Sequence, residues 1–178
     1  MYLFFDTEFT DFEHMELISI GIISEDKKHV FYKEVYDYPK NRCSEFVKDI
    51  VIPLLSGCDY AASYTQLANL LASWIEELPS ENIIFVADYD GDREILSKLL
   101  NLIPDLNKKV NIQMIQQSFV LTAVERGTYN TNNINLAFSH CQISIEDELS
   151  SIPELQHHAL YDALCNLNGW ISGHNLLK

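Results

Sequence analysis

The sequence predicts a single α/β domain over residues 1–178, with a sheet that starts antiparallel and continues parallel. Three segments rich in β-branched and aromatic residues open the chain, and only short polar stretches separate them, as expected for hairpin-linked strands. After them, apolar residues at helical spacing alternate with short apolar runs, a pattern typical of α/β proteins. No repeat, low-complexity tract or linker divides the sequence.

The predicted elements follow one another in a simple order. The five predicted strands are the opening MYLFFDTEFT segment and residues 16–24, 29–36, 82–88 and 110–116. The predicted helices cover residues 44–54, 64–78, 93–103 and 156–171, and further helices are expected within residues 118–140. The NIIFVAD run of the fourth strand is almost entirely apolar, so we expect it to be buried on both faces. The result is a mixed five-stranded sheet that helices flank.

The composition restricts the class of protein. The formal net charge is −14, the opposite of the basic footprint that phosphate-binding surfaces usually carry. The same acidity is typical of a protein that gathers carboxylates around divalent cations, so the charge alone does not decide. The four cysteines lack C-x-x-C spacing, which argues against a zinc site or a disulfide framework. Because no signal-peptide pattern or long apolar segment is present, we expect a cytoplasmic protein with no membrane partner.

The opening strand carries two carboxylates on one face. Asp6 and Glu8 flank Thr7, and side chains two residues apart in a strand point to the same side. Two like charges on a buried face are costly unless a cation lies between them. The apolar YLFF run before them is typical of a central strand, so the pair indicates a site rather than solvated surface.

Two further segments supply carboxylates. Asp88, Asp90 and Asp92 lie where the fourth strand passes into a helix, which in an open α/β sheet is beside the ends of neighbouring strands. Each could also be a simple helix N-cap. Asp162 interrupts an apolar helical face within QHHALYDALCN, where an unpartnered acid is uncommon. Together these oxygen ligands suit Mg²⁺ or Mn²⁺, and two such ions roughly 3.5 to 4 Å apart form the clamp used for phosphodiester cleavage.

At these residues the sequence resembles the DEDDh group of 3′-to-5′ exonucleases, whose fold is ribonuclease H-like. Residues 6–8 match the first motif, D-x-E, and FVADYDGDREIL stands where the second motif places an Asp that opens a helix. The segment HHALYDA, residues 157–163, matches the third motif, H-x-A-x-x-D-A, at every specified position. DTEFT followed soon by ELISIGIIS is similar, more closely, to the small bacterial and phage exoribonucleases related to ribonuclease T.

The resemblance implies a metal-dependent exoribonuclease that hydrolyses RNA from its 3′ end and releases nucleoside 5′-monophosphates. It implies two divalent cations, Mg²⁺ or Mn²⁺, and four carboxylate ligands. The implied ligands are Asp6, Glu8, Asp92 and Asp162. His157 would be the general base that deprotonates the attacking water, and it completes the predicted catalytic set. Asp92 is preferred for the second motif because apolar residues follow it three and four positions on, and Asp88 is the alternative.

The resemblance also implies substrate contacts and partners. Thr7, Phe9 and Thr10 are the predicted substrate-binding residues, and Phe12 is a weaker candidate. Single-stranded RNA or a 3′ overhang is the implied partner, and a homodimer is expected because relatives often form one. Two alternatives remain open: an exodeoxyribonuclease on single-stranded DNA, and a catalytically silent nucleic-acid-binding module of the same fold. A regulatory protein that binds divalent cations is disfavoured, because DYDGDREIL lacks the ligand spacing of an EF-hand.

Overall fold

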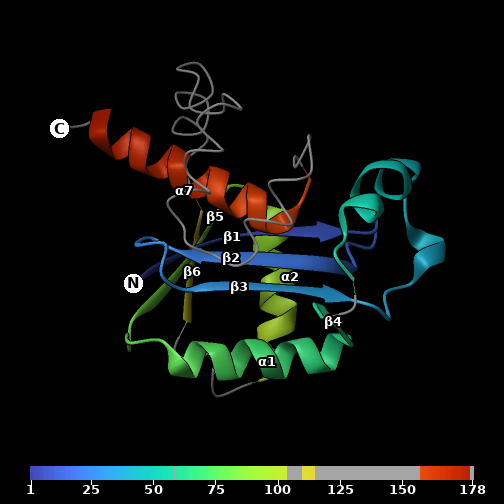
Figure 1. Ribbon diagram of the computed structural model, residues 1–178, viewed down its shortest axis with the longest axis horizontal. Coiled ribbons are helices and arrows are strands. Elements are labelled where there is room, and N and C mark those ends of the chain that lie inside the picture. Colours follow the sequence, from blue (N-terminus) through green and yellow to red (C-terminus); the bar gives the residue numbers. More distant parts are fainter. Residues whose placement is uncertain (58, 104–109, 115–156, 177–178) are drawn as a thin grey trace.

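The computed structural model describes residues 1–57, 59–103, 110–114 and 157–176. They form one mixed sheet of six strands in the order β4-β3-β2-β1-β5-β6, flanked by helices (Figure 1). The strands are β1 (Tyr2–Phe9), β2 (Leu17–Ser24), β3 (Val30–Val35), β4 (Ala61–Ala62), β5 (Ile83–Ala87) and β6 (Val110–Met114). The helices are η1 (Lys40–Arg42), η2 (Val47–Val51), η3 (Ile52–Leu54), α1 (Tyr64–Glu77), α2 (Asp90–Leu100) and α7 (Ala159–Leu176).

The predicted α/β class and mixed sheet are confirmed, and the predicted strand count is wrong. β1, β2 and β3 pair antiparallel, whereas β5 and β6 continue the sheet from β1 in parallel. The sixth strand is β4, which pairs in parallel with the end of β3. Sequence reasoning missed it because two alanines are too short a stretch to display an alternating pattern.

Three predicted helices need comment. The segment predicted as a helix over residues 44–54 is helical, but its defined turns are the π-type η2 and the 3₁₀-type η3, where Pro53 lacks the N–H that a continuing α-helix would need. The helix predicted from residue 156 begins only at Ala159, because His157 has a left-handed backbone with φ of 71°. The helices predicted within residues 118–140 lie outside the described residues.

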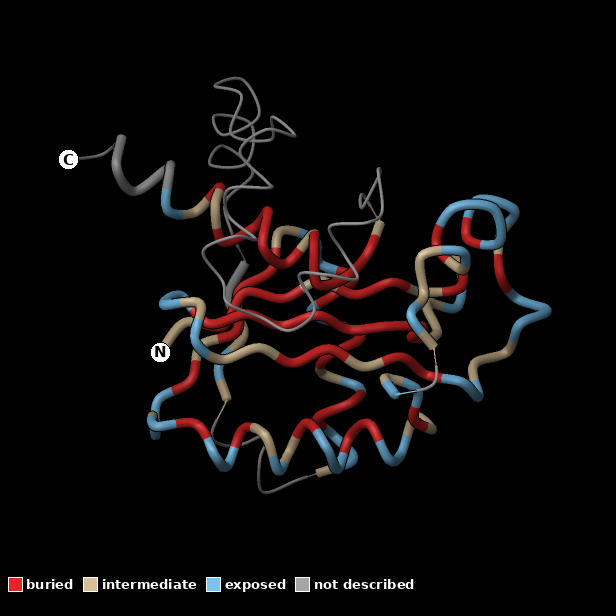
Figure 2. The backbone as a smooth tube through the Cα atoms, in the orientation of Figure 1, coloured by how far each residue is buried: buried red, intermediate tan, exposed pale blue. Residues whose placement is uncertain are grey.

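Helices cover both faces of the sheet (Figure 1). A hydrophobic core lies on each face, and side chains of β1 pack in both. Leu3 and Phe5 of β1 pack in the core that also holds residues of α1 and α2, whereas Phe4 packs with α7 on the opposite face. Figure 2 shows the central strands buried along most of their length, and β2 is buried throughout. Even-numbered residues of β1 therefore face α7, which places Asp6 and Glu8 on that side.

Within the part of the chain that the structure describes, no helix is long and apolar enough to cross a membrane.

Candidate active site

A cavity of about 740 Å³ lies at the C-terminal end of β1. The lining comes from four segments far apart in the sequence: β1 with the residues just after it, the segment of Ser44, Phe46 and Val47, the passage from β5 into α2, and the start of α7. The acidic residues and the histidine in this lining are Asp6, Glu8, Asp11, Asp88, Asp92, His157 and Asp162. The structure therefore brings all five predicted catalytic residues to one cavity, together with the alternative Asp88. None of the described residues that line it is a lysine or arginine.

The pairing register of β1 and β5 places the carboxylates of Asp6 and Asp88 side by side. Phe4 pairs with Val86 in the parallel ladder, so two residues further along each strand Asp6 lies beside Asp88. α2 then begins at Asp90 and carries Asp92 back toward the sheet. Oxygen atoms of Asp6, Asp88 and Asp92 all lie within 4.8 Å of one another, which makes one candidate cation site.

Thr7 fixes the position of Asp92. Its hydroxyl donates a 2.5 Å hydrogen bond to Asp92 Oδ1, and its backbone N–H donates to the same oxygen at 3.2 Å. Asp92 is only 2% exposed, so these two bonds replace the water that its carboxylate loses. Thr7 was predicted to bind substrate, and the structure gives it this contact with a predicted metal ligand.

Gly21 lets α7 approach the sheet closely enough to deliver Asp162. Gly21 of β2 pairs with Asp6, and a Cβ atom on it would lie 2.2 Å from the backbone nitrogen of Leu160. Only glycine leaves room for the helix backbone at this point. Asp162 lies two residues along α7, so this contact determines how near its carboxylate comes to β1.

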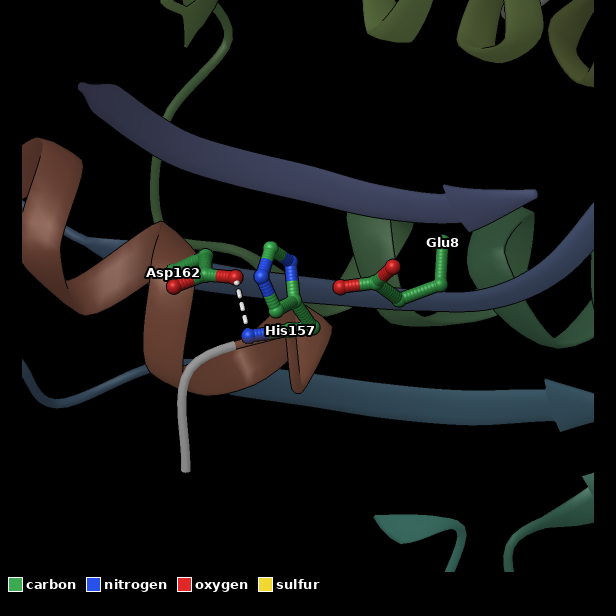
Figure 3. A group of neighbouring side chains, drawn as sticks. All are labelled: Glu8, His157 and Asp162. Carbon is green, nitrogen blue, oxygen red and sulfur yellow. Dashed lines mark hydrogen bonds between the residues drawn. The ribbon is translucent and has the colours of Figure 1, made fainter. Parts of the chain in front are cut away.

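Asp162, His157 and Glu8 form a second group beside the first. Asp162 Oδ2 accepts a 3.0 Å hydrogen bond from the backbone N–H of His157, which holds the turn before α7 against the helix. Ligand atoms of Glu8, His157 and Asp162 lie within 4.8 Å of one another. In Figure 3 the His157 ring lies between the carboxylates of Glu8 and Asp162. The rings of Phe46 and His157 pack edge to face, with their centroids 4.8 Å apart.

Asn166 was not predicted from the sequence, yet it contacts the site. Its side-chain amide donates a 2.9 Å hydrogen bond to Asp88 Oδ1, and the residue is 3% exposed. Asn166 follows Asp162 by four residues, one helical turn, so both side chains lie on the same face of α7. This four-residue spacing from Asp162 is the sequence feature that could have identified Asn166 as a site residue. Asp88 and Asp92 are thus both held beside Asp6, and the choice between them need not be exclusive.

Burial and mutual repulsion raise the pKa of four carboxyl groups of the site, those of Asp6, Glu8, Asp92 and Asp162. The pKa of Asp6 is raised well above its usual range by burial and then by the charges of Asp92 and Asp162. Burial, with Asp162 next, raises the pKa of Glu8 to about 9. Burial also raises the pKa of Asp92 and of Asp162 to about 7, against the lowering effect of the hydrogen bonds from Thr7 and His157. Without a cation, the site therefore keeps protons near pH 7 instead of carrying its full negative charge, and a bound cation would favour the ionised carboxylates.

The two adjacent histidines have different environments. His157 lines the cavity, and partial burial lowers the pKa of its imidazole. His158 is 2% exposed, stacks on the Tyr32 ring at 4.6 Å and does not line the cavity. Burial lowers the pKa of His158 to about 4, so this ring stays neutral in the core. Of the pair, His157 is the one placed to meet a ligand.

The predicted substrate contacts separate into two groups. Phe9 lines the cavity, just after a β-bulge that interrupts the β1–β2 pairing. Thr10 is fully buried and does not line the cavity, since its hydroxyl accepts the backbone N–H of Glu16 at 3.3 Å. Phe12, the weaker candidate, lines the cavity and is 79% exposed.

The donor set fits divalent cations that prefer oxygen. The two candidate groups hold five carboxylates, which are hard ligands, and the described cavity lining contains no lysine or arginine to neutralise them. Asp6 lies beside both Asp92 and Asp162, whose charges act on it most strongly after burial, so it is placed between the two groups of ligands. The arrangement can accept one cation near Asp88 and Asp92 and another near Glu8 and Asp162.

The chain matches no protein-family model and shows no significant match to a curated protein.

Proposed function

We propose that the protein is a metal-dependent 3′-to-5′ exoribonuclease of the DEDDh type, with a ribonuclease H-like fold. One observation carries the proposal: residues 6–8, Asp92, His157 and Asp162, which stand in segments that resemble the three motifs of that group, converge on a single cavity. Acidic clusters alone are common on proteins. A cluster that is buried, drawn from three distant segments and joined by one histidine fits phosphodiester hydrolysis better than surface decoration.

The carboxylates would bind and orient two divalent cations. Asp6, Asp88 and Asp92 would hold one ion, and Glu8 and Asp162, together with Asp6, would hold the other. Such ions, when bound, supply positive charge to the scissile phosphate and lower the pKa of an attacking water. Thr7 and Asn166 keep the ligands in place, because each donates a hydrogen bond to a carboxylate oxygen.

His157 would accept the proton of the attacking water. Its lowered pKa leaves the imidazole neutral near pH 7, so one ring nitrogen is free to act as a base. Its ring lies beside Glu8 and Asp162, where a water bound near their cation would be within reach (Figure 3). Phe46 packs against the ring and restricts its orientation.

Digestion of labelled single strands tests the proposal. RNA and DNA of one sequence, labelled at the 5′ end, are incubated with Mg²⁺, with Mn²⁺ or with EDTA. We expect a metal-dependent ladder that shortens from the 3′ end, with RNA cleaved faster than DNA. Faster cleavage of DNA would assign the site to the exodeoxyribonuclease alternative, and no cleavage of either strand would favour the silent binding module.

Two neighbouring aspartates provide a matched pair of variants. Asp92→Asn removes a buried predicted ligand, whereas Asp90→Asn changes a side chain that is 74% exposed and paired with Arg93. We expect Asp92→Asn to lower cleavage by at least 100-fold and Asp90→Asn to leave it unchanged. Equal activity in both variants would remove Asp92 from the site.

A further inference from the structure

A segment between β3 and β4, which sequence reasoning did not assign to the site, forms one wall of the cavity. Its lining residues are Ser44, Phe46 and Val47. In Figure 1 the blue-green helical turns of this segment lie beyond the arrowheads of β1 and β3. The backbone N–H of Ser44 donates a 2.9 Å hydrogen bond to the carbonyl oxygen of Thr10, and Phe46 packs on His157. The wall therefore connects the end of β1 with the start of α7.

Ser44 presents a hydroxyl group to this cavity. Its Oγ accepts the backbone N–H of Val47 at 3.2 Å, which holds the side chain in one orientation, and the residue is half-buried. Within the described ranges of the chain, no acceptor takes the hydrogen of this hydroxyl. A serine hydroxyl donates one hydrogen bond besides those it accepts. Ser44 can therefore still donate to a ligand.

Most other polar groups of the described lining already have a partner or a proposed ligand. The Thr7 hydroxyl donates to Asp92, and Asp11 accepts two backbone N–H groups of its own turn. The carboxylates of the two candidate groups would hold the cations. Tyr89 carries a further hydroxyl, but this residue is 42% exposed and lies at the open edge of the cavity. Ser44 is thus the half-buried neutral donor of the described lining.

Ser44 lies near the cation group of Glu8, His157 and Asp162. Thr10, which its backbone contacts, follows Glu8 by two residues, and an extended chain advances about 7 Å over that distance. Phe46, two residues after Ser44, packs on His157 from the same wall. A phosphate held by a cation at this group would have its neighbouring atoms within reach of the wall. In a nucleotide, the group next to the phosphate is the sugar.

We infer that Ser44 Oγ donates a hydrogen bond to the 2′-hydroxyl of the 3′-terminal nucleotide, and that this contact favours RNA over DNA. The inference rests on the proposed function, which places the scissile phosphate among the carboxylates. The 2′-hydroxyl is the group by which a protein distinguishes RNA from DNA at a given position. A deoxyribose would leave the half-buried Ser44 hydroxyl without this acceptor, which weakens its binding. The contact reads the sugar and leaves the base unread.

Removal of one 2′-hydroxyl from the substrate tests the contact. Two RNA strands differ only at the 3′-terminal nucleotide, which is either a ribonucleotide or a 2′-deoxyribonucleotide, and kcat/KM is measured for the first cleavage. One neutral hydrogen bond corresponds to roughly a 2- to 10-fold preference. We expect Ser44→Ala to lower the ribose-to-deoxyribose ratio by this factor, through slower cleavage of the ribose strand alone. Loss of the hydrogen bond to Val47 would slow both strands equally and leave the ratio unchanged.

Two further variants serve as controls. Ser44→Thr keeps a hydroxyl and should keep the preference. Tyr89→Phe removes the other hydroxyl and should leave the ratio at its wild-type value. An unchanged ratio in Ser44→Ala would overturn the inference, and so would a preference that disappears in Tyr89→Phe instead.

Nucleotide binding separates this inference from the proposed function. Calorimetry with Mn²⁺ compares AMP with 2′-deoxy-AMP, neither of which has a phosphodiester bond to cleave. Wild type should bind AMP more tightly by roughly 2- to 10-fold, and Ser44→Ala should lose this difference. Equal affinities in wild type would overturn the sugar contact even if the protein degrades RNA. A preference for AMP that depends on Ser44, in a protein that cleaves no strand, would support the contact and overturn the exonuclease.

Discussion

Replacement of Gly21 by alanine tests whether the approach of α7 to the sheet assembles the site. The new Cβ would lie 2.2 Å from Leu160 N, 2.3 Å from Leu160 Cα and 2.5 Å from the carbonyl carbon of Ala159. These are backbone atoms, so no side-chain rotation relieves the clash. A separation of at least about 3.0 Å is needed, and the helix start must therefore move about 0.8 Å away from β2.

That movement would carry Asp162 and His157 away from Glu8. A displacement near 1 Å at a catalytic group costs on the order of 100-fold in rate. Overpacking of a buried contact costs about 1 to 3 kcal/mol, which lowers Tm by roughly 2 to 12 °C for a chain of this size. We therefore expect Gly21→Ala to fold, to melt several degrees lower, and to cleave RNA about 100-fold more slowly at saturating Mn²⁺.

Thermal melts and the cleavage assay measure the two effects, and Gly57→Ala provides the control. Gly57 has φ of 70°, so alanine there is strained, but no atom lies within 4 Å of its Cβ position. That variant should lose about 1 kcal/mol of stability and keep full activity. If Gly21→Ala cleaved RNA at the wild-type rate, close packing of α7 on β2 would not be what positions Asp162.

Three further predictions concern the site itself. His157→Ala should lower kcat by roughly 100- to 10,000-fold and leave Mn²⁺ binding, measured by calorimetry, nearly intact. His158→Ala should mainly lower Tm, because this ring packs in the core. The reverse pattern would assign the role of general base to His158. Thr7→Val removes the hydroxyl that bonds Asp92, so calorimetry should find Mn²⁺ binding about tenfold weaker, and unchanged affinity would show that the bond does not orient this ligand. Without metal, the free energy of unfolding should fall by on the order of a few kcal/mol between pH 5 and pH 9, because folded Glu8 keeps its proton to about pH 9 while the unfolded chain releases it near pH 4.5. Urea titrations should show this slope, and Glu8→Gln should reduce it to the part that Asp6, Asp92 and Asp162 contribute. An equal slope in Glu8→Gln and wild type would mean that the pKa of Glu8 is not raised.

Local features were predictable because their cause lies within a few residues. Alternation along a strand places Asp6 and Glu8 on one face whatever the rest of the chain does. The helical spacing of leucines predicted residues 64–78, and α1 covers Tyr64–Glu77, begun by a capping box at Ser63. The antiparallel start and parallel continuation of the sheet also followed from the lengths of the connections.

The positions of predicted residues relative to one another needed the tertiary structure. Asp88, Asp90 and Asp92 are equivalent as helix-opening acids, and only the β1–β5 register and the Thr7 bonds bring two of them to Asp6 while Asp90 faces solvent. Thr10 is close in sequence to the site but is buried in the β1–β2 connection.

By itself the sequence determined the α/β class, the face of the first strand that carries charge, and the candidate ligands. The tertiary structure alone decided that β4 joins the sheet, that α7 starts after His157 rather than before it, and that Asn166 reaches Asp88. The physical reason is that periodicity reports which side of an element is buried. The distances between elements depend on close backbone contacts, such as that of Gly21 with Leu160, between residues far apart in the chain.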